Sequence, residues 1–341
     1  MASPVEVAAM RRALDLARTP GVPRGPNPRV GCVLLDPAGR VVADGYHRGA
    51  GHPHAEVDAL LATGTSVAGT TAVVTLEPCN HTGRTGPCVA ALLDAGVQRV
   101  VYAQPDTNPL ARGGADALRR AGVDVEGGVL ADEARSVNPE WTFALDYGRP
   151  FVTWKFAATL DGRSAATDGT SRWITSPEAR ADVHRSRAEC DVVLVGTGTL
   201  LADNPQLTVR DGTGTPLGRR FQPLRAIMGL RSIPPDAAVT DGAADIIHLA
   251  TRDPHDALAA LYRRDRQHVW LEGGPTVAAA FLREDLVDRV VAYIAPALLG
   301  AGLAAVGDLG VATVADALAL HVTEVTAVGP DLRITARPGK E

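Results

Sequence analysis

One imidazole and two thiols are spaced along the first third of the chain as ligands of a catalytic zinc ion would be. His54 and Glu56 form an H-x-E motif, Cys79 follows Pro78, and Cys88 lies further along the chain. One His and two Cys supply three zinc ligands, and the fourth position stays open for water, as in catalytic zinc sites. The sequence therefore predicts a zinc ion held by His54, Cys79 and Cys88.

Glu56 is the candidate for proton transfer at this zinc ion. Zinc lowers the pKa of its bound water towards about 7, and in zinc-dependent nucleobase deaminases the Glu of H-x-E moves protons without binding the metal. A helix that begins near His54 would place Glu56 in its first turn, where the helix dipole stabilises a carboxylate. Taken singly, a lone His is an ordinary helix cap and a buried Cys an ordinary small hydrophobic residue. Their combination favours a deaminase.

The segment between the two cysteines is longer than the two-residue gap that is usual in zinc deaminases. It runs from Asn80 to Pro87 and contains His81, Arg84 and Thr85 among glycines. These side chains and free backbone amides suit an anionic or polar substrate group. The alternative is a solvated turn.

Two glycine-rich turns mark the C-terminal half. Gly273-Gly274-Pro275 follows an apolar strand, and Gly196-Thr197-Gly198 follows another. Backbone amides at a helix N-terminus bind phosphate, so two such turns in one sheet predict a dinucleotide lying across them. Each turn could also be a common loop. Neither is a GxGxxG motif in a Rossmann unit, and that fold is disfavoured.

Strands and helices that alternate along the first half would position the zinc ligands. Apolar periodicity predicts helices over residues 5–17, 54–62, 89–95, 115–121 and 131–140. Strands are expected over residues 30–35, 41–43, 71–76, 100–103 and 123–126, with a hairpin turn at 37–40. The alternation predicts a layered α/β domain with a largely parallel sheet.

A second domain is expected after the turn at Asp146 to Pro150, giving domains at residues 1–146 and 150–341. Ser176 as N-cap and Pro177 at the first helical position predict a helix there. Strands are expected over residues 151–156, 191–195, 225–228, 246–250, 269–271 and 289–294. Residues 211–223 are polar and glycine-rich, which indicates a mobile surface loop.

Composition narrows the possible partners. The chain of 341 residues has a net charge of −5 and 4% aromatic residues, which opposes nucleic-acid binding. Four cysteines and an N-terminus without signal-peptide character predict reduced thiols in the cytoplasm. The longest apolar stretch, 290–306, contains Pro296, Gly300 and Gly302, so a buried strand and loop are expected there and no membrane span.

Several motifs resemble one enzyme family in order along nearly the whole chain, about residues 5 to 335. Residues 27–31, 53–56, 75–79 and 81–88 are similar to the deaminase half of the bifunctional deaminase-reductases of riboflavin biosynthesis, which share the long segment between the cysteines. Residues 155–163, 171–176, 200–210, 272–276 and 293–296 resemble the reductase half. The resemblance implies a cytidine-deaminase-like α/β domain followed by a dihydrofolate-reductase-like α/β domain.

The resemblance also implies both reactions. The deaminase, with one Zn²⁺, would replace the 2-amino group of 2,5-diamino-6-ribosylamino-4(3H)-pyrimidinone 5′-phosphate with oxygen. The reductase would deliver hydride from NADPH to C1 of the sugar and convert ribosyl to ribityl. A homo-oligomer, dimer or tetramer, would be expected.

Site residues follow from the resemblance position by position. In the deaminase half, Asn27 would contact the substrate, beside the candidates His81 and Arg84. NADPH would be lined by Ala158, Trp173, Thr199, Asp203, Gly274, Pro275, Thr276, Val277, Ala278, Ala279 and Ala280. The reductase substrate would face Ser171, Arg187, Leu207, Arg210 and Glu272. Arg187 and Arg210 suit a ribose phosphate, and Asp203 or Glu272 suits ribose hydroxyls or proton transfer.

Two departures from the family pattern leave alternatives open. Gly86-Pro87 replaces two prolines, which we expect to be harmless. Family members usually follow this strand with an acidic residue and then Ser or Gly, whereas this chain has Met228-Gly229-Leu230. The next residue, Arg231, either contacts the 2′-phosphate of the cofactor or is a surface residue. The runner-up function is therefore a deaminase with a non-reducing C-terminal half, and a third is a nucleic-acid deaminase. Packing or solvent contact alone is expected for His47, His52, His184 and His268.

Overall fold

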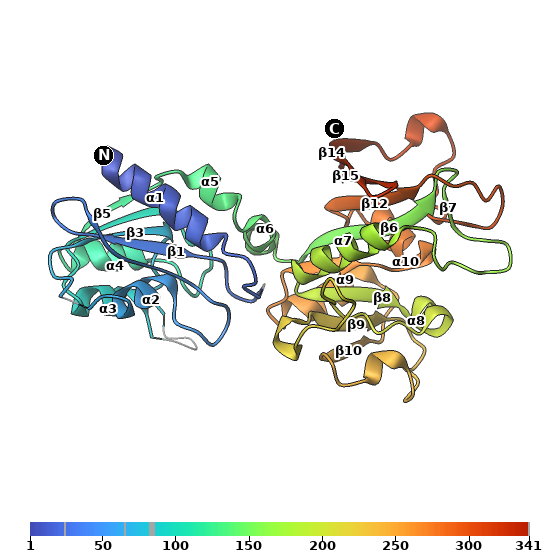
Figure 1. Ribbon diagram of the computed structural model, residues 1–341, viewed down its shortest axis with the longest axis horizontal. Helices are drawn as coiled ribbons and strands as arrows, with labels where there is room; N and C mark the ends of the chain where they lie inside the picture. The colour runs from blue at the N-terminus through green and yellow to red at the C-terminus, as the bar shows by residue number, and fades with distance from the viewer. Residues whose placement is uncertain (24, 65, 82–85, 340–341) are drawn as a thin grey trace. The chain divides into compact units, whose positions relative to one another are not determined.

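The chain consists of two units, each with its own sheet and core (Figure 1). The computed structural model describes residues 1–23, 25–64, 66–81 and 86–339. The units are Met1–Gly148 and Arg149–Glu341. The expected domain limits fall beside this division, and as functional boundaries they remain a prediction.

Among the described residues of the first unit, five strands form one sheet in the order β2-β1-β3-β4-β5. Their bounds are β1 Gly31–Leu35, β2 Val41–Tyr46, β3 Thr71–Leu76, β4 Arg99–Gln104 and β5 Asp124–Gly127. β3, β4 and β5 are parallel, but β1 is antiparallel to both β2 and β3. In strand direction the sheet is therefore largely parallel, as expected, because β2, β3, β4 and β5 all run the same way and the tight β1–β2 hairpin leaves β1 alone reversed.

Helices cover both faces of this sheet (Figure 1). They are α1 Pro4–Ala17, α2 Ala55–Leu61, α3 Cys88–Asp94, α4 Gly114–Arg120, α5 Ala131–Arg135 and α6 Pro139–Tyr147. Val33 and Leu35 pack towards α1 and α5, whereas Cys32 and Leu34 pack towards α2 and α3. Because successive side chains of β1 point to opposite faces of the sheet, these contacts show that α2 and α3 begin on the same face.

The single helix expected over residues 131–140 is wrong, because α5 ends at Arg135 and α6 begins at Pro139. Proline has no backbone N–H and clashes with the preceding turn inside a helix, but it is well suited to the first helical position. Pro139 therefore opens a new helix.

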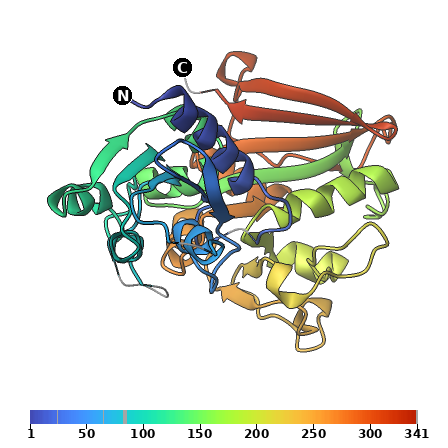
Figure 2. The same cartoon turned by 60° about the vertical axis from the view of Figure 1, so that its left-hand side comes forward.

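In the described part of the second unit, the largest sheet has the order β10-β9-β8-β11-β6-β12-β15-β14. Its strands are β6 Phe151–Thr159, β8 Val192–Gly196, β9 Leu224–Met228, β10 Ile246–Leu249, β11 His268–Leu271, β12 Arg289–Ala295, β14 Leu320–Val328 and β15 Asp331–Pro338. The strands from β10 to β12 are parallel, β15 pairs antiparallel with β12, and β14 pairs antiparallel with β15. Short strands β7 Arg163–Ala165 and β13 Leu303–Ala304 pair separately. Figure 2 shows the β14–β15 hairpin in red at the edge of the sheet.

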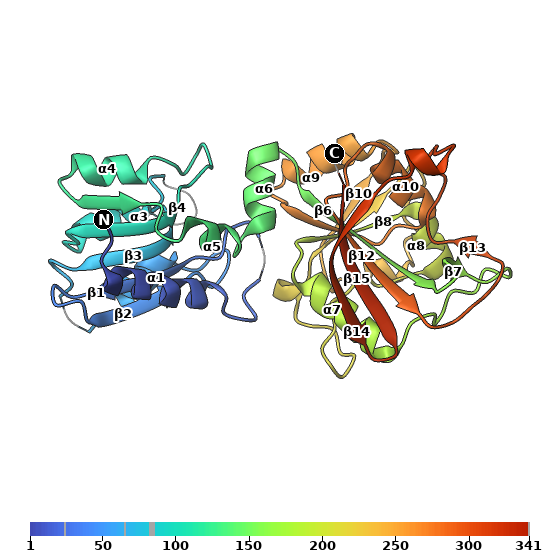
Figure 3. The same ribbon diagram turned by 90° about the horizontal axis from the view of Figure 1, so that it is seen from above.

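Figure 3 shows α9 and α10 on the opposite side of this sheet from α7. The helices are α7 Pro177–Ala188, α8 Thr197–Asp203, α9 Pro254–Tyr262 and α10 Pro275–Arg283, with 3-10 turns η1 Arg219–Phe221, η2 Ala238–Thr240 and η3 Val314–Asp316. Ser176 caps α7 by accepting from the Ala179 amide, which confirms the predicted helix start. The stretch 290–306 is β12 followed by loop and β13, as expected. Within the described ranges, no helix combines the length and apolarity that a bilayer crossing needs.

Arg99, at the start of β4, joins three carboxylates of the first unit. Its guanidinium lies 2.6 Å from Glu6 on α1 and 2.7 Å from Glu126 on β5, and it also pairs with Asp124. Burial raises the pKa of Glu6, but the hydrogen bonds and charge of Arg99 and the bonds from Ser3 lower it overall. The cluster ties α1 to the β4–β5 edge.

Arg99→Met is expected to lower the free energy of unfolding by about 2 kcal/mol, because it leaves the buried Glu6 carboxylate without its main partner. Urea denaturation measures this loss. Arg119→Met is the matched control, since the Arg119–Asp116 pair is exposed and worth at most about 0.5 kcal/mol. Equal effects of the two changes would contradict the structural role of Arg99.

Candidate functional site

The predicted zinc ligands come from three element ends and meet in the first unit. His54 is the N-cap residue of α2, Cys79 follows β3, and Cys88 is the first residue of α3. His54 Nδ1 and the two Sγ atoms all lie within 4.8 Å of one another, with His54 Nδ1 at 3.2 Å from Cys88 Sγ and 3.5 Å from Cys79 Sγ. Tetrahedral bonds of about 2.0–2.3 Å place zinc ligand atoms roughly 3.5 Å apart. The donor set and its spacing fit zinc.

The electrostatics of the Cys79 thiol also favour a metal. Hydrogen bonds from the Cys88 thiol and then from His54 lower the pKa of Cys79 to about 4, although burial opposes this. The pKa of Cys88 is raised, first by its hydrogen bond to Cys79 and then by burial. The Cys88 backbone N–H also donates to Cys79 Sγ at 3.4 Å. A thiolate at Cys79 is the form that binds zinc.

Glu56 lies in the first turn of α2 and is 4% exposed. Burial, and secondly the charge of Cys79, raise the pKa of Glu56 to about 7. A carboxyl group with a pKa near neutrality both accepts and returns a proton readily, and a bound cation would favour its ionised form. The geometry therefore suits a proton shuttle beside the three ligands.

His47 belongs to this site, although the sequence indicated only packing or solvent contact. Its Nε2 lies 3.1 Å from Nδ2 of Asn27, and its Nδ1 lies 2.9 Å from the Pro53 carbonyl oxygen. Its ring meets the His54 ring edge-on, with 5.4 Å between centroids. The pairing of the β1–β2 hairpin continues as far as His47, whose N–H donates to the Val30 carbonyl. This pairing is what places His47 close to Asn27.

A second missed group lies after β4. Burial raises the pKa of Asp106 to about 6, with the charges of Glu77 and Cys79 adding to the rise and His81 opposing it. Glu77 is buried and accepts from the backbone N–H groups of Asp106 and Ala115, at 3.1 and 2.9 Å. It thereby fixes the loop that carries Asp106 close to Cys79. His81 lies close enough to this loop for its charge to act on Asp106. Arg84 and Thr85 lie outside the described residues.

In the second unit, the two predicted glycine turns lie side by side. Gly196 is the N-cap of α8 after β8, Gly274 is the N-cap of α10 after β11, and these two strands are neighbours. The Gly274 N–H donates to Thr199 Oγ1 at 3.1 Å. Gly229, after β9, has φ 138°, and a Cβ there would lie 2.5 Å from Thr197 Oγ1. The ends of three adjacent strands thus form one edge, at which α8 and α10 begin, and helix N-termini suit phosphates.

A charged cluster lies between α7 and the sheet. Arg187 Nε and Nη2 each lie 2.6 Å from an oxygen of Glu272, and Trp270 Nε1 donates to the same carboxylate. Burial would raise the pKa of Glu272, but the charge and hydrogen bonds of Arg187, the charge of Lys155 and the bond from Trp270 lower it to about 2. Burial lowers the pKa of Lys155, opposed by Glu272. The Arg187 guanidinium, which was predicted to bind a phosphate, is therefore already paired with the Glu272 carboxylate.

The other predicted reductase residues differ in burial and in their contacts. Ala158 is buried on β6, whereas Trp173 is exposed, with the Arg180 guanidinium 4.4 Å from its ring centre. Arg172 donates to the Asp203 carbonyl, so the segment that carries Ser171 and Trp173 reaches the end of α8. Pro275, Thr276, Val277, Ala278, Ala279 and Ala280 form the first turns of α10. Leu207 is buried, and Arg210 contacts Gln206 and Gly214.

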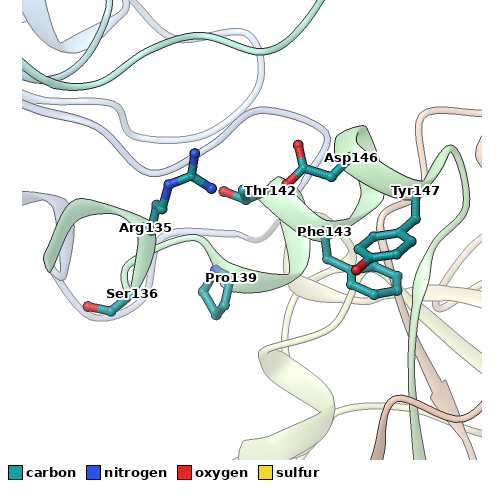
Figure 4. Close-up of a pocket in the computed structure, with 7 residues that line it drawn as sticks. All are labelled: Arg135, Ser136, Pro139, Thr142, Phe143, Asp146 and Tyr147. Carbon is teal, nitrogen blue, oxygen red and sulfur yellow. The ribbon is translucent and has the colours of Figure 1, made fainter. Parts of the chain in front are cut away.

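A separate shallow pocket of about 350 Å³ lies along α5 and α6 (Figure 4). In it the rings of Phe143 and Tyr147 stack with centroids 4.3 Å apart. None of the predicted site residues lines it. Its lining is Arg135, Ser136, Pro139, Thr142, Phe143, Asp146 and Tyr147.

Two families match the two units. Residues 5–104 match the cytidine and deoxycytidylate deaminase zinc-binding region, and residues 150–334 match the RibD C-terminal domain. The riboflavin biosynthesis protein RibD of Mycobacterium tuberculosis H37Rv is 50% identical over 91% of both chains. The protein of that name from Escherichia coli K12 is 38% identical over 95% of this chain and 96% of its own.

Solved structures agree with these sequence relatives. Acinetobacter baumannii RibD superposes with a TM-score of 0.89 at 35% identity, covering 98% of this chain and 99% of that one. A Thermotoga maritima structure titled a diaminohydroxyphosphoribosylaminopyrimidine deaminase/5-amino-6-(5-phosphoribosylamino)uracil reductase has a TM-score of 0.85 at 32% identity, with the same coverage. The expected deaminase-like and reductase-like folds are confirmed, and the presence of both domains favours two activities over a deaminase alone. With a zinc-binding deaminase domain followed by a reductase domain that implies a nicotinamide cofactor, this chain belongs to the RibD family of bifunctional deaminase-reductases of riboflavin biosynthesis.

Proposed function

We propose that this enzyme takes the two substrates named for its Thermotoga relative, in that order. It deaminates 2,5-diamino-6-ribosylamino-4(3H)-pyrimidinone 5′-phosphate and then reduces the ribosyl group of the resulting uracil to ribityl. The observation that carries the first step is the meeting of His54, Cys79 and Cys88 beside the buried Glu56. The charged cluster beside two glycine turns supports the second step.

In the deaminase, His54, Cys79 and Cys88 would hold zinc, which supplies an activated water when bound. Glu56 accepts a proton at a carboxylate oxygen and returns it to the departing amino nitrogen. The C–N bond breaks, oxygen replaces nitrogen at the ring carbon, and ammonia leaves. Asn27, held by His47 at 3.1 Å, orients the pyrimidine, with His81 and Arg84 as further substrate contacts.

In the reductase, the Gly196 and Gly274 turns, Ala158, Trp173, Thr199, Asp203 and the start of α10 would hold NADPH. The cofactor supplies hydride to C1 of the sugar. Lys155 and Arg210 add positive charge for the phosphate, and Ser171 and Leu207 line the substrate. Glu272 stays ionised with a pKa of about 2, so it orients ribose hydroxyls and does not donate a proton.

The preference for NADPH over NADH is assigned to Arg231. Its Nη2 lies 3.7 Å from the point that a Cβ on Gly198 would occupy, so the guanidinium lies over the turn after β8. Arg231→Ala is expected to raise the KM for NADPH about 10-fold and to leave the KM for NADH unchanged, since one charge-assisted contact to the 2′-phosphate is lost. Initial rates with each cofactor measure this. An equal change for both cofactors would make Arg231 a general surface residue.

Self-association is proposed through β14, the edge strand of the large sheet. Val325 and Leu332 are exposed apolar residues on one face of the β14–β15 hairpin, and unpaired edges with apolar side chains favour pairing with another copy. Light scattering is expected to show a dimer or tetramer, and Val325→Glu a smaller species. A wild-type monomer at micromolar concentration would contradict this. The four cysteines form no disulfide, which agrees with the proposed cytoplasmic location.

A coupled assay of the purified protein tests the function. Without cofactor, the diaminopyrimidine ribosylamino phosphate is expected to gain about one dalton, because N–H is replaced by oxygen. With NADPH, a further gain of about two daltons should accompany the loss of absorbance at 340 nm. The first step without the second would restore the deaminase-only alternative.

A further inference from the structure

Arg225 is a buried cation that the proposed reaction does not use. It lies on β9 and is 0% exposed. Its Nη1 donates to the Gln206 carbonyl at 3.1 Å and to Asp241 Oδ1 at 2.8 Å, and its Nη2 donates to the Ala244 carbonyl at 2.6 Å. A buried guanidinium is costly without such partners, and here both terminal nitrogens have them while the buried Nε has none. Arg225 thus connects the sheet to two loops, one of which leads to Arg210.

Two side chains in sequence, Asp241 and Gln206, continue this connection to Arg210. Asp241 uses its second oxygen to accept from Gln206 Nε2 at 3.3 Å. The amide oxygen of Gln206 accepts from Arg210 Nη2. The Arg210 guanidinium is therefore held at Nη2 by Gln206 and at Nη1 by the Gly214 carbonyl, at 2.6 Å. Asp241 holds the Gln206 side chain, and Arg225 holds both Asp241 and the Gln206 backbone carbonyl.

The backbone between Gln206 and Arg210 is held from the same strand and from α7. Gln222, just before β9, accepts from the Val209 N–H at 2.7 Å and donates to the Val209 carbonyl at 3.0 Å. Arg187 Nη1 donates to the Thr208 carbonyl at 3.0 Å. Leu207 has φ 55°, a left-handed conformation that a branched residue keeps only when its surroundings enforce it.

We propose that Arg225, acting through Asp241 and Gln206, is a positioning residue that aims Arg210 at the substrate phosphate. The inference rests on the proposed reductase function and deepens it. A planar guanidinium recognises a phosphate monoester through two parallel hydrogen bonds, and such recognition depends on orientation. Without Arg225 the charge of Arg210 remains, but its fork is no longer fixed.

Two variants test the connection, and a third is the matched control. Asp241→Asn keeps the shape of the side chain and removes its charge, and Arg225→Met removes the donor. Arg219→Met makes the same chemical change at an exposed Arg that pairs with Asp245 and donates to the Gly242 carbonyl at 3.3 Å, so it holds the loop of Asp241 from outside the route to Arg210. The full-length enzyme is assayed for reduction of the phosphorylated substrate and of its dephosphorylated counterpart.

Asp241→Asn and Arg225→Met are expected to raise the KM for the phosphorylated substrate about 10-fold, by the loss of one aligned charge-assisted contact, with kcat nearly unchanged. The KM for the dephosphorylated substrate, the deaminase activity and the Arg219→Met enzyme should be unaffected. In an Arg210→Ala background, Arg225→Met should add nothing further, because the two residues act as one unit. Arg225→Lys should restore part of the phosphate preference.

Other outcomes overturn the inference and separate it from the proposed function. Equal losses with both substrates, or losses additive with Arg210→Ala, would give Arg225 a purely structural role while the reductase assignment stands. An Arg210→Ala enzyme with unchanged phosphate preference would refute both the Arg210 assignment and its positioning. Calorimetric measurement of ribose 5-phosphate binding compares the same variants without turnover. If Arg225→Met does not fold, Asp241→Asn and Arg225→Lys test the inference in its place.

Discussion

Glu56→Gln is expected to lower the kcat of deamination by about 10²- to 10⁴-fold while zinc stays bound, because a positioned acid-base group is removed and the ligands are not. Glutamine has nearly the same shape as glutamate, but its amide cannot accept and return a proton. His54, Cys79 and Cys88 remain within 4.8 Å of one another for the metal. Single-turnover deamination and metal analysis of the same sample provide the measurement.

Glu133→Gln is the matched control for this change, since Glu133 is an exposed acid on α5. It should deaminate at the wild-type rate. The reductase activity of the Glu56→Gln chain, assayed with the deaminated substrate, should also be unchanged. Loss of zinc in parallel with activity would instead make Glu56 a ligand or a structural residue.

The zinc ligands could be predicted from sequence because each lies at the end of a local element. His54 and Cys88 begin helices and Cys79 follows a strand, so local periodicity places all three. His47 and Asp106 could not be found in that way. Their places depend on the register of a hairpin and on a loop that Glu77 holds from a distance, which are contacts between elements.

The second unit shows the same limit. Its parallel strands are buried on both faces and read as continuous apolar runs, which is why they were predicted closely. The β14–β15 hairpin was missed, because its exposed strands mix polar and apolar residues on both faces. The left-handed Leu207 and the buried Arg225 likewise depend on tertiary partners that no local pattern encodes.

Arg187→Met is expected to abolish detectable reduction and to destabilise the second unit by about 3–5 kcal/mol, the usual cost of breaking a buried ion pair. Both oxygens of Glu272 lose a 2.6 Å partner, and the Thr208 carbonyl loses its donor. Calorimetric unfolding and NADPH oxidation measure the two effects. Arg185→Met, two residues earlier on α7 and exposed, should change neither by more than about 0.5 kcal/mol or twofold.

The pH dependence of unfolding separates the ion pair from simple loss of packing. The pKa of Glu272 is about 2 in the folded chain and 4.5 for an ordinary Glu, so the pair stabilises fully above pH 4.5 and progressively less as the pH falls towards 2. Arg187→Met should flatten this slope, because the pKa of Glu272 rises when its main cation is removed. Adding Glu272→Gln to Arg187→Met should recover stability, since no uncompensated carboxylate remains buried. A double variant less stable than Arg187→Met would show that the Glu272 carboxylate is held by Lys155 and Trp270 without need of Arg187.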